Sequence, residues 1–163
     1  MNPIWEPGTN YDSFFYVVFD LDGTIADDGH RLHFIEGPTR NDDAWVNYFR
    51  ACTEDKPIES MCRLFRHLSN PVVVNPATVV EIWTGRSEIV RHETNVWLRG
   101  NGLYPHRLMM RPDGIYESNV ELKAEWLQAA PRKPDLVIDD NLKVVEWWRS
   151  QGVFALAAGT ANF

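Results

Sequence analysis

The chain has 163 residues, of which 44% are hydrophobic and 24% are charged, and this suits one domain of about 100–200 residues. Sixteen basic residues against 23 acidic residues give a formal net charge of −7, the wrong sign for a broad surface that grips a nucleic-acid backbone. No stretch approaches the roughly 18 apolar residues that span a bilayer. We therefore expect a single domain over residues 1–163, without membrane association or extended nucleic-acid binding, whose oligomeric state the sequence leaves open.

The N-terminus and the cysteines indicate the cellular compartment. Residues 1–8 lack the basic region and apolar core of a secretory signal, so a cytoplasmic location is expected. The only two cysteines, Cys52 and Cys62, show no CxxC or Cys/His spacing. We therefore expect reduced cysteines that pack in the core, rather than a disulfide framework or a zinc site.

Five short apolar runs are typical of buried strands in a parallel sheet. They cover residues 14–19, 78–83, 107–110, 136–138 and 153–157, with a further extended piece at 72–74. Helical patterns lie between them at 87–99, 118–129 and 141–150, where Ser118 and Glu121 form a capping box and Gly100 and Gly152 are expected to end helices. This alternation predicts an α/β fold with a single doubly wound, Rossmann-like parallel sheet, which binds ligands beyond the carboxyl ends of its strands.

Residues 27–70 interrupt this alternation. Two helical patterns fit there, at 42–51 and 58–68, each with apolar side chains on one face. We interpret 27–70 as a small helical cap insert that follows the first strand, with an ordinary helical crossover as the alternative.

Asp20-Leu21-Asp22-Gly23-Thr24 directly follows the first predicted strand. Residues i and i+2 of an extended chain point the same way, so the carboxylates of Asp20 and Asp22 would face one cleft. Two carboxylates this close repel each other unless a cation lies between them, and Mg²⁺ prefers such oxygen ligands. A second acidic pair, Asp139-Asp140, ends another predicted strand. Two acidic pairs at strand ends favour a metal site over solvated loop acids.

Two further features are weak alone. Thr84-Gly85-Arg86 ends a strand and opens a predicted helix, where a hydroxyl, free amides and the helix dipole can bind an anionic oxygen. Lys123 lies one turn inside its predicted helix, and taken by itself it would be interpreted as a solvated surface lysine.

Taken in order, these features resemble the four motifs of the haloacid dehalogenase superfamily of phosphohydrolases, across residues 15–160. The resemblance implies that Asp20 attacks phosphorus to form an aspartyl-phosphate, while Asp22 protonates the leaving oxygen and then activates water. It also implies that Mg²⁺ is held by Asp20, the main-chain carbonyl of Asp22 and the Asp139-Asp140 pair. Asp140 is favoured as the direct ligand, with Asp139 in support.

The chain is similar, more narrowly, to the 3′-phosphatase domain of polynucleotide kinase phosphatases. The likeness rests on the DxDGT core followed by Arg31, the Thr84-Gly85-Arg86 triplet, Met110-Arg111-Pro112 and the run from Ile138 to Arg149. It implies that Arg31 and Arg86 bind phosphate beside Gly85, that Thr84 hydrogen-bonds the phosphoryl oxygens, and that Lys123 pairs with nucleophile and phosphate.

This chain departs from that family at two positions before Lys123. The relatives usually carry an arginine and an aspartate there, whereas this chain has Glu117 and Asn119. No GxxxxGK[ST] phosphate loop occurs, so a kinase half is absent from the sequence.

The predicted function is that of a Mg²⁺-dependent phosphomonoesterase acting on nucleotide-type substrates. A mononucleotide phosphate and the terminal 3′-phosphate of a nucleic acid both remain open. Trp45, with Tyr48 and Phe49 in the predicted insert, is the candidate for nucleobase contact. The alternatives are a phospho-aspartate signalling receiver and a catalytically inactive module that binds nucleotides or nucleic-acid ends.

Overall fold

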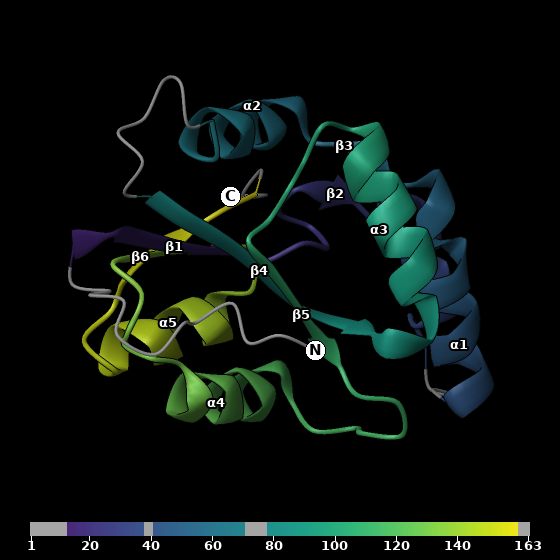
Figure 1. Cartoon of the computed structure of the whole chain (residues 1–163). Helices are drawn as coiled ribbons and strands as arrows, with labels where there is room; N and C mark the ends of the chain where they lie inside the picture. The colour runs from purple at the N-terminus through teal and green to yellow at the C-terminus, as the bar shows by residue number, and fades with distance from the viewer. Residues whose placement is uncertain (1–12, 38–40, 71–77, 160–163) are drawn as a thin grey trace.

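Five parallel strands form the central sheet of the structure, a computed structural model that describes residues 13–37, 41–70 and 78–159 (Figure 1). The strands are β1 (Phe15–Phe19), β4 (Thr78–Ser87), β5 (Arg107–Arg111), β6 (Leu136–Asp139) and β7 (Phe154–Ala157). Their order is β5-β4-β1-β6-β7, and every neighbouring pair is parallel. Because the chain moves outward from the central β1 in both directions, the predicted doubly wound α/β sheet is confirmed. The extended piece expected at 72–74 lies outside the described residues.

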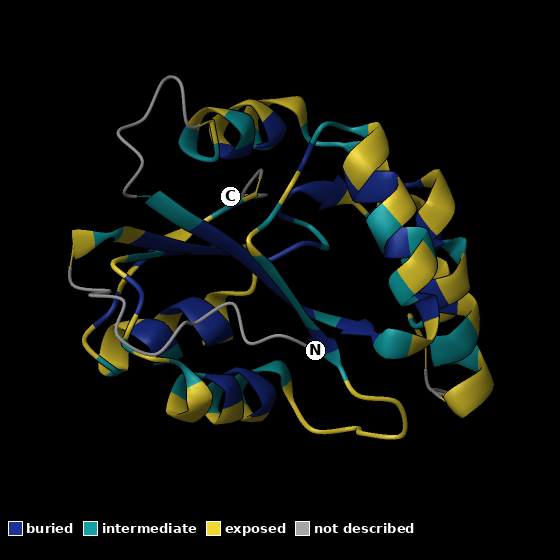
Figure 2. Ribbon diagram, in the orientation of Figure 1, coloured by how far each residue is buried: buried dark blue, intermediate teal, exposed yellow. Residues whose placement is uncertain are grey.

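Helices cover both faces of this sheet (Figure 1). On one face, α2 (Glu59–Leu68) and α3 (Arg91–Gly100) pack over Val17 and Phe19 of β1. On the other face, α4 (Asn119–Ala129) and α5 (Leu142–Ser150) pack over Tyr16 and Val18. Since alternate residues of β1 serve opposite cores, its sequence is apolar at every position rather than at every second one. Figure 2 shows the same division, with the central strands β1 and β4 largely buried and the helices exposed on their outer sides.

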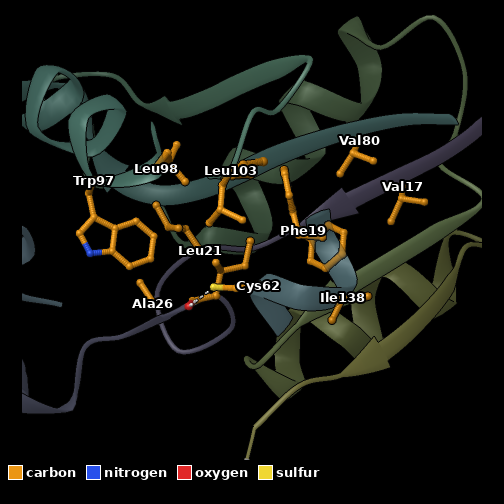
Figure 3. Packing of buried hydrophobic residues seen from close by; sticks show 13 residues of the cluster. Val17, Phe19, Leu21, Ala26, Cys62, Val80, Trp97, Leu98, Leu103 and Ile138 are labelled. Carbon is orange, nitrogen blue, oxygen red and sulfur yellow. Dashed lines mark hydrogen bonds between the residues drawn. The ribbon is translucent and has the colours of Figure 1, made fainter. Parts of the chain in front are cut away.

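The core between the sheet, α2 and α3 surrounds the region where β1 ends (Figure 3). The rings of Phe19 and Phe65 lie 5.3 Å apart, in a tilted arrangement. Cys62 is buried beside them, and its Sγ donates a weak hydrogen bond to the carbonyl of Ile25 at 3.8 Å. Both Cys52 and Cys62 are free and buried, as predicted.

The chain between β1 and α2 forms an excursion beside the carboxyl edge of the sheet. It contains β2 (Ala26–Asp27), the 3₁₀ helix η2 (Gly29–Phe34), α1 (Asp42–Arg50), the 3₁₀ helix η3 (Ala51–Glu54) and β3 (Lys56–Pro57). Antiparallel pairing of β2 with β3 closes the excursion at its base. The two helices of the stretch 27–70 therefore pack differently. Helix α2 packs against one face of the central sheet, whereas α1 belongs to a separate hydrophobic cluster.

Two predicted boundaries were wrong. Ser87 is an N-cap as expected, because its Oγ accepts a hydrogen bond from the amide of Ile89 at 3.3 Å, but it caps a 3₁₀ turn, η4 (Glu88–Val90), and α3 begins only at Arg91. Gly100 stays helical, and the left-handed residue is Gly102 with φ 68°. The turn at Gly102 returns the chain to the core, where the amide of Leu103 donates to the carbonyl of Leu98.

Other local predictions were confirmed. Ser118 and Glu121 form the reciprocal capping box at the start of α4. Gly152 follows α5 in the left-handed conformation, with φ 76°. Within the described residues, no helix is long and apolar enough to cross a membrane.

Candidate active site

The carboxyl ends of β1, β4 and β6 lie side by side, so the motifs that follow them meet at one edge of the sheet. Lys123 reaches this edge from α4 and is almost completely buried. Its Nζ donates to Asp20 Oδ1 at 2.7 Å and to Asp139 Oδ2 at 2.5 Å. The structure therefore excludes the alternative of a solvated lysine and joins three predicted site residues in one ion-pair network.

Asp20, Asp139 and Asp140 form a carboxylate cluster, in which one oxygen from each lies within 4.8 Å of the others. Burial raises the pKa of Asp20 well above its usual range, and Asp139 and Asp140 add to the effect while Lys123 opposes it. Burial, followed by the charge of Asp139, raises the pKa of Asp140 to about 7. Lys123 therefore compensates only part of the negative charge that the three carboxylates bring together.

These oxygen donors fit a magnesium ion. Three carboxylates against one ammonium leave an excess of two negative charges, the charge that a divalent cation offsets. Mg²⁺ prefers hard oxygen ligands of this kind. Asp140 is the exposed member and its carboxylate makes no ion pair with Lys123, whereas Asp139 is buried on the lysine. This arrangement favours Asp140 as a direct ligand and Asp139 as a ligand fixed by Lys123.

Gly23 allows the chain to turn sharply directly after Asp22, where the backbone lies against the side chain of Asp140. Its φ of 77° lies in the left-handed region, and a Cβ there would overlap the carboxylate of Asp140. Both the backbone conformation and the close approach of Asp140 therefore require glycine.

The side chain of Asp22 turns away from the carboxylate cluster and toward two arginines. Arg31 Nη2 donates to Asp22 Oδ1 at 2.5 Å, and Arg86 contacts both Asp22 oxygens. Asp55 completes the group, since it accepts from Arg31 Nε and Nη2 and from Arg86 Nη2, all at 2.7 Å. Burial alone would raise the pKa of Asp22, but the two guanidinium groups hold it below its usual range.

Both arginines are fully buried, and neither lines the cavity at this edge. Their predicted role in phosphate binding stays a prediction, because in this structure their guanidinium groups are bound by Asp22 and Asp55. Asp55 was missed by the sequence analysis, since only the pairing of β2 with β3 brings it to this position.

Thr84 and Gly85 lie at the carboxyl end of β4, as predicted. Thr84 is buried, and its Oγ1 accepts a hydrogen bond from the amide of Arg86 at 3.1 Å. A Cβ on Gly85 would overlap the side-chain amide of Asn119. Arg111 holds this corner together by donating to the Gly85 carbonyl at 2.9 Å and to Asn119 Oδ1 at 2.6 Å. Asn119, one of the two positions at which this chain departs from the family, therefore places its side-chain amide, bound by Arg111, beside Gly85.

A cavity of about 490 Å³ opens above these groups. Its floor carries the acidic motifs, one wall comes from α1 with Asp28 and Ile35 at the two ends of η2, and the opposite wall is the loop between β5 and α4, residues 112–118. Trp45 lines the first wall, with its ring stacked on Phe49 at 5.8 Å and edge-on to Tyr48. Asp28 also lines the cavity and accepts from the Tyr48 hydroxyl at 2.6 Å. Neither Asp28 nor this hydrogen bond was predicted from the sequence.

The parallel sheet, the acid pair after β1 and the buried lysine beside a second acid pair define a haloacid dehalogenase-type phosphohydrolase fold. The family described as the polynucleotide kinase PNKP phosphatase domain matches residues 15–163. The chain therefore belongs to this family of phosphatase domains.

Solved structures share the fold at low sequence identity. A structure of a Pnkp1/Rnl/Hen1 complex is 18% identical with a TM-score of 0.68, over 93% of this chain and 48% of that one. The structure of the Pnkp1/Rnl/Hen1 RNA repair complex is 16% identical with a TM-score of 0.73, over 100% of this chain and 48% of that one. The chain thus spans about half the length of these two. A haloacid dehalogenase-like hydrolase from Streptococcus pneumoniae is 15% identical with a TM-score of 0.61, over 92% and 89% of the two chains. No curated protein matches the chain.

Proposed function

We propose that the chain is a Mg²⁺-dependent phosphomonoesterase that acts on nucleotide-type substrates through an aspartyl-phosphate on Asp20. The observation that carries this proposal is the convergence of Asp20, Asp139 and Asp140 within 4.8 Å, with the buried Lys123 bound to two of them. A nucleophile and a set of oxygen ligands thus face one cavity, and the buried ammonium group of Lys123 is bound to two of these carboxylates, an arrangement that suits phosphoryl transfer.

Asp20 is the nucleophile in this proposal. Its Oδ1 is held by Lys123 at 2.7 Å, which orients the carboxylate toward an incoming phosphorus. Attack forms the bond between the carboxylate oxygen and phosphorus and breaks the ester bond, so the electron pair leaves with the alcohol oxygen. Mg²⁺, when bound by the carboxylate cluster, supplies charge neutralisation for the transferring group.

Asp22 is the proton donor to the leaving oxygen in the first step and the proton acceptor from water in the second. The arginine pair favours its ionised form, which accepts a proton from water when the aspartyl-phosphate is hydrolysed. Protonation of the leaving oxygen in the first step requires the ion pairs of Asp22 to weaken. Arg31 and Arg86 would release Asp22 if an incoming phosphate attracted their guanidinium groups, which is how we connect their position to phosphate binding.

The substrate class includes mononucleotides and the terminal 3′-phosphate of a nucleic acid. Family membership supports the terminal phosphate. The aromatic wall at Trp45 and Tyr48 supports contact with a nucleobase. The net charge of −7 is unfavourable for extended contact with a nucleic-acid backbone.

The test is release of inorganic phosphate from 3′- and 5′-mononucleotides, 3′-phosphorylated oligonucleotides and sugar phosphates, with and without Mg²⁺. We expect turnover of at least one nucleotide class that depends on Mg²⁺. Asp20→Asn should lower kcat by at least about 10³-fold, while Glu146→Gln, an exposed change on α5, should keep full activity.

Either of two results would contradict the proposal: no turnover of any substrate class, or full activity of Asp20→Asn. No turnover would favour the alternative of an inactive binding module. The receiver alternative is disfavoured already, since the chain belongs to a phosphatase family and carries its DxD sequence after the first strand.

A further inference from the structure

The floor of the cavity has a balanced charge once a divalent cation is bound. The excess of two negative charges on Asp20, Asp139 and Asp140 equals the charge of that cation. The second buried group is neutral by itself, because the carboxylates of Asp22 and Asp55 face two arginines. The described groups of the floor therefore carry no excess of positive charge that could attract a second phosphate.

The mouth of the cavity is acidic. Asp42 at the start of α1 and Asp113 in the opposite wall are both exposed and both line the cavity. They meet around Tyr116, whose hydroxyl hydrogen-bonds Asp42 and whose pKa is raised mainly by the charge of Asp42 and also by that of Asp113. Asp28 adds a third carboxylate deeper on the same wall as Asp42. The exposed rim of the cavity therefore carries a carboxylate from each of the two walls.

In the described part of the chain, little positive charge offsets this mouth. Among the described residues that line the cavity, Arg111 is the one basic side chain. Its guanidinium group donates hydrogen bonds to the carbonyls of Gly85 and Glu117 and to Asn119. Burial lowers the pKa of Arg111, and the negative charge of Glu117 opposes this shift. Arg111 is thus committed to holding the loop in place and has little capacity left for a second phosphate.

The walls between mouth and floor are largely apolar and aromatic. Their apolar side chains are Ile35, Trp45, Val46, Tyr48, Phe49, Ile89, Pro112, Ile115 and Tyr116. A flat aromatic ring can pack against Trp45, which is itself fixed by stacking on Phe49. The cavity volume of about 490 Å³ is in the range of sites for one small organic ligand.

From this distribution we infer that the site selects a phosphomonoester of a single nucleoside, and that Asp42 and Asp113 repel leaving groups that carry a further phosphodiester. The inference rests on the proposed function and narrows its substrate class. The phosphate to be cleaved meets the cation and Lys123, and the base packs on the aromatic wall. A second phosphate would lie among the mouth carboxylates without a counter-charge, which disfavours binding electrostatically.

The experiment compares kcat/KM for pairs of substrates with the same terminal nucleoside. One pair is a nucleoside 3′-monophosphate and the 3′-phosphorylated trinucleotide, and a second pair carries the phosphates at the 5′ end. At low salt we expect a preference for the mononucleotide of about tenfold or more, falling as salt screens the mouth charges. In Asp42→Asn/Asp113→Asn the ratio of trinucleotide to mononucleotide kcat/KM should rise by about three- to tenfold.

Glu125→Gln/Glu146→Gln is the matched control, because it removes two exposed carboxylates from α4 and α5 that do not line the cavity. It should leave the substrate ratio and its salt dependence unchanged. Equal or better turnover of the trinucleotide by the wild-type protein would overturn the inference and leave the phosphomonoesterase proposal intact. The same ratio in the mouth variant as in wild type would also overturn it. Absence of turnover on every substrate would overturn the phosphomonoesterase proposal and this inference with it.

Discussion

Two glycines show, at the scale of single residues, what the site demands of the backbone. Gly23 and Gly152 have almost the same left-handed conformation, with φ of 77° and 76°. Their surroundings differ, since a Cβ on Gly23 would overlap the carboxylate of Asp140, whereas nothing lies within 4 Å of a Cβ on Gly152. The pair therefore separates the cost of the backbone conformation from the cost of displacing a side chain of the carboxylate cluster.

We expect Gly152→Ala to lower the free energy of unfolding by about 1–2 kcal/mol, the cost of a left-handed L-residue, without changing kcat. Gly23→Ala should cost more than this and should also lower kcat, because Asp140 must move away from the carboxylate cluster. Urea unfolding and phosphate release measure the two effects. Equal losses of stability and equal activities in the two variants would show that the overlap with Asp140 is harmless.

Glu81 is a buried acid that the proposed mechanism does not use. It lies in β4 and is fully buried, and its Oε2 accepts from the Tyr16 hydroxyl at 2.8 Å and from Trp83 Nε1 at 2.7 Å. Its Oε1 has no hydrogen-bond partner among the residues that the structure describes. Burial raises the pKa of Glu81 above its usual range, although both hydrogen bonds oppose the shift.

This raised pKa predicts a pH-dependent gain from Glu81→Gln. When the pKa of a carboxyl group is higher in the folded protein than in the unfolded chain, the free energy of unfolding falls as the pH rises from the unfolded-state pKa through the folded-state pKa. Gln does not titrate, so the stability of Glu81→Gln relative to wild type should increase as the pH rises from about 4.5 through the raised pKa of Glu81. Urea unfolding across this range measures the difference, with the exposed Glu125→Gln as control. A difference that is constant with pH would contradict the assigned shift.

At the scale of elements, the apolar runs predicted the strands because a strand buried on both faces needs apolar residues throughout. The motif residues at the ends of β1, β4 and β6 followed from the same argument, since parallel strands end at one edge. Asp55 and Asp28 could not be found in this way. Each depends on how the excursion folds, through the contact of Asp55 with Arg31 and of Asp28 with Tyr48, and a local pattern contains no such long-range pairing.

The position of α1 predicts a role for Trp45 in substrate binding. Trp45→Ala removes the aromatic face of this wall and should raise KM for a nucleotide by about tenfold, given about 1–3 kcal/mol for stacking of one base. KM for glycerol phosphate, which has no ring, should change little. Tyr104→Ala is the control, since Tyr104 is exposed and does not line the cavity. A similar increase of KM for both substrates would argue against contact with the base.

For the whole molecule, the net charge of −7 has a local component at the site. Asp20, Asp139 and Asp140 are held together within the folded chain, and Lys123 compensates one of their charges. Folding therefore concentrates repulsion that the unfolded chain does not have. A cation that binds the folded cluster, and not the unfolded chain, should stabilise the protein by mass action.

We expect Mg²⁺ to raise the melting temperature at about pH 7.5. A concentration about 100 times the Kd stabilises by about 2.7 kcal/mol, or roughly 5–10 °C for a chain of this size. Asp140→Asn removes the exposed carboxylate of the cluster and should move the midpoint of the Mg²⁺ titration at least about tenfold higher, if one carboxylate contributes about 1.4 kcal/mol or more. Each variant is compared with its own metal-free melting temperature, because Asp140→Asn also relieves repulsion from Asp139. Glu146→Gln should titrate like wild type. An unchanged midpoint in Asp140→Asn would exclude Asp140 as a ligand, and a wild-type melting temperature that does not respond to Mg²⁺ would exclude the cluster as a magnesium site.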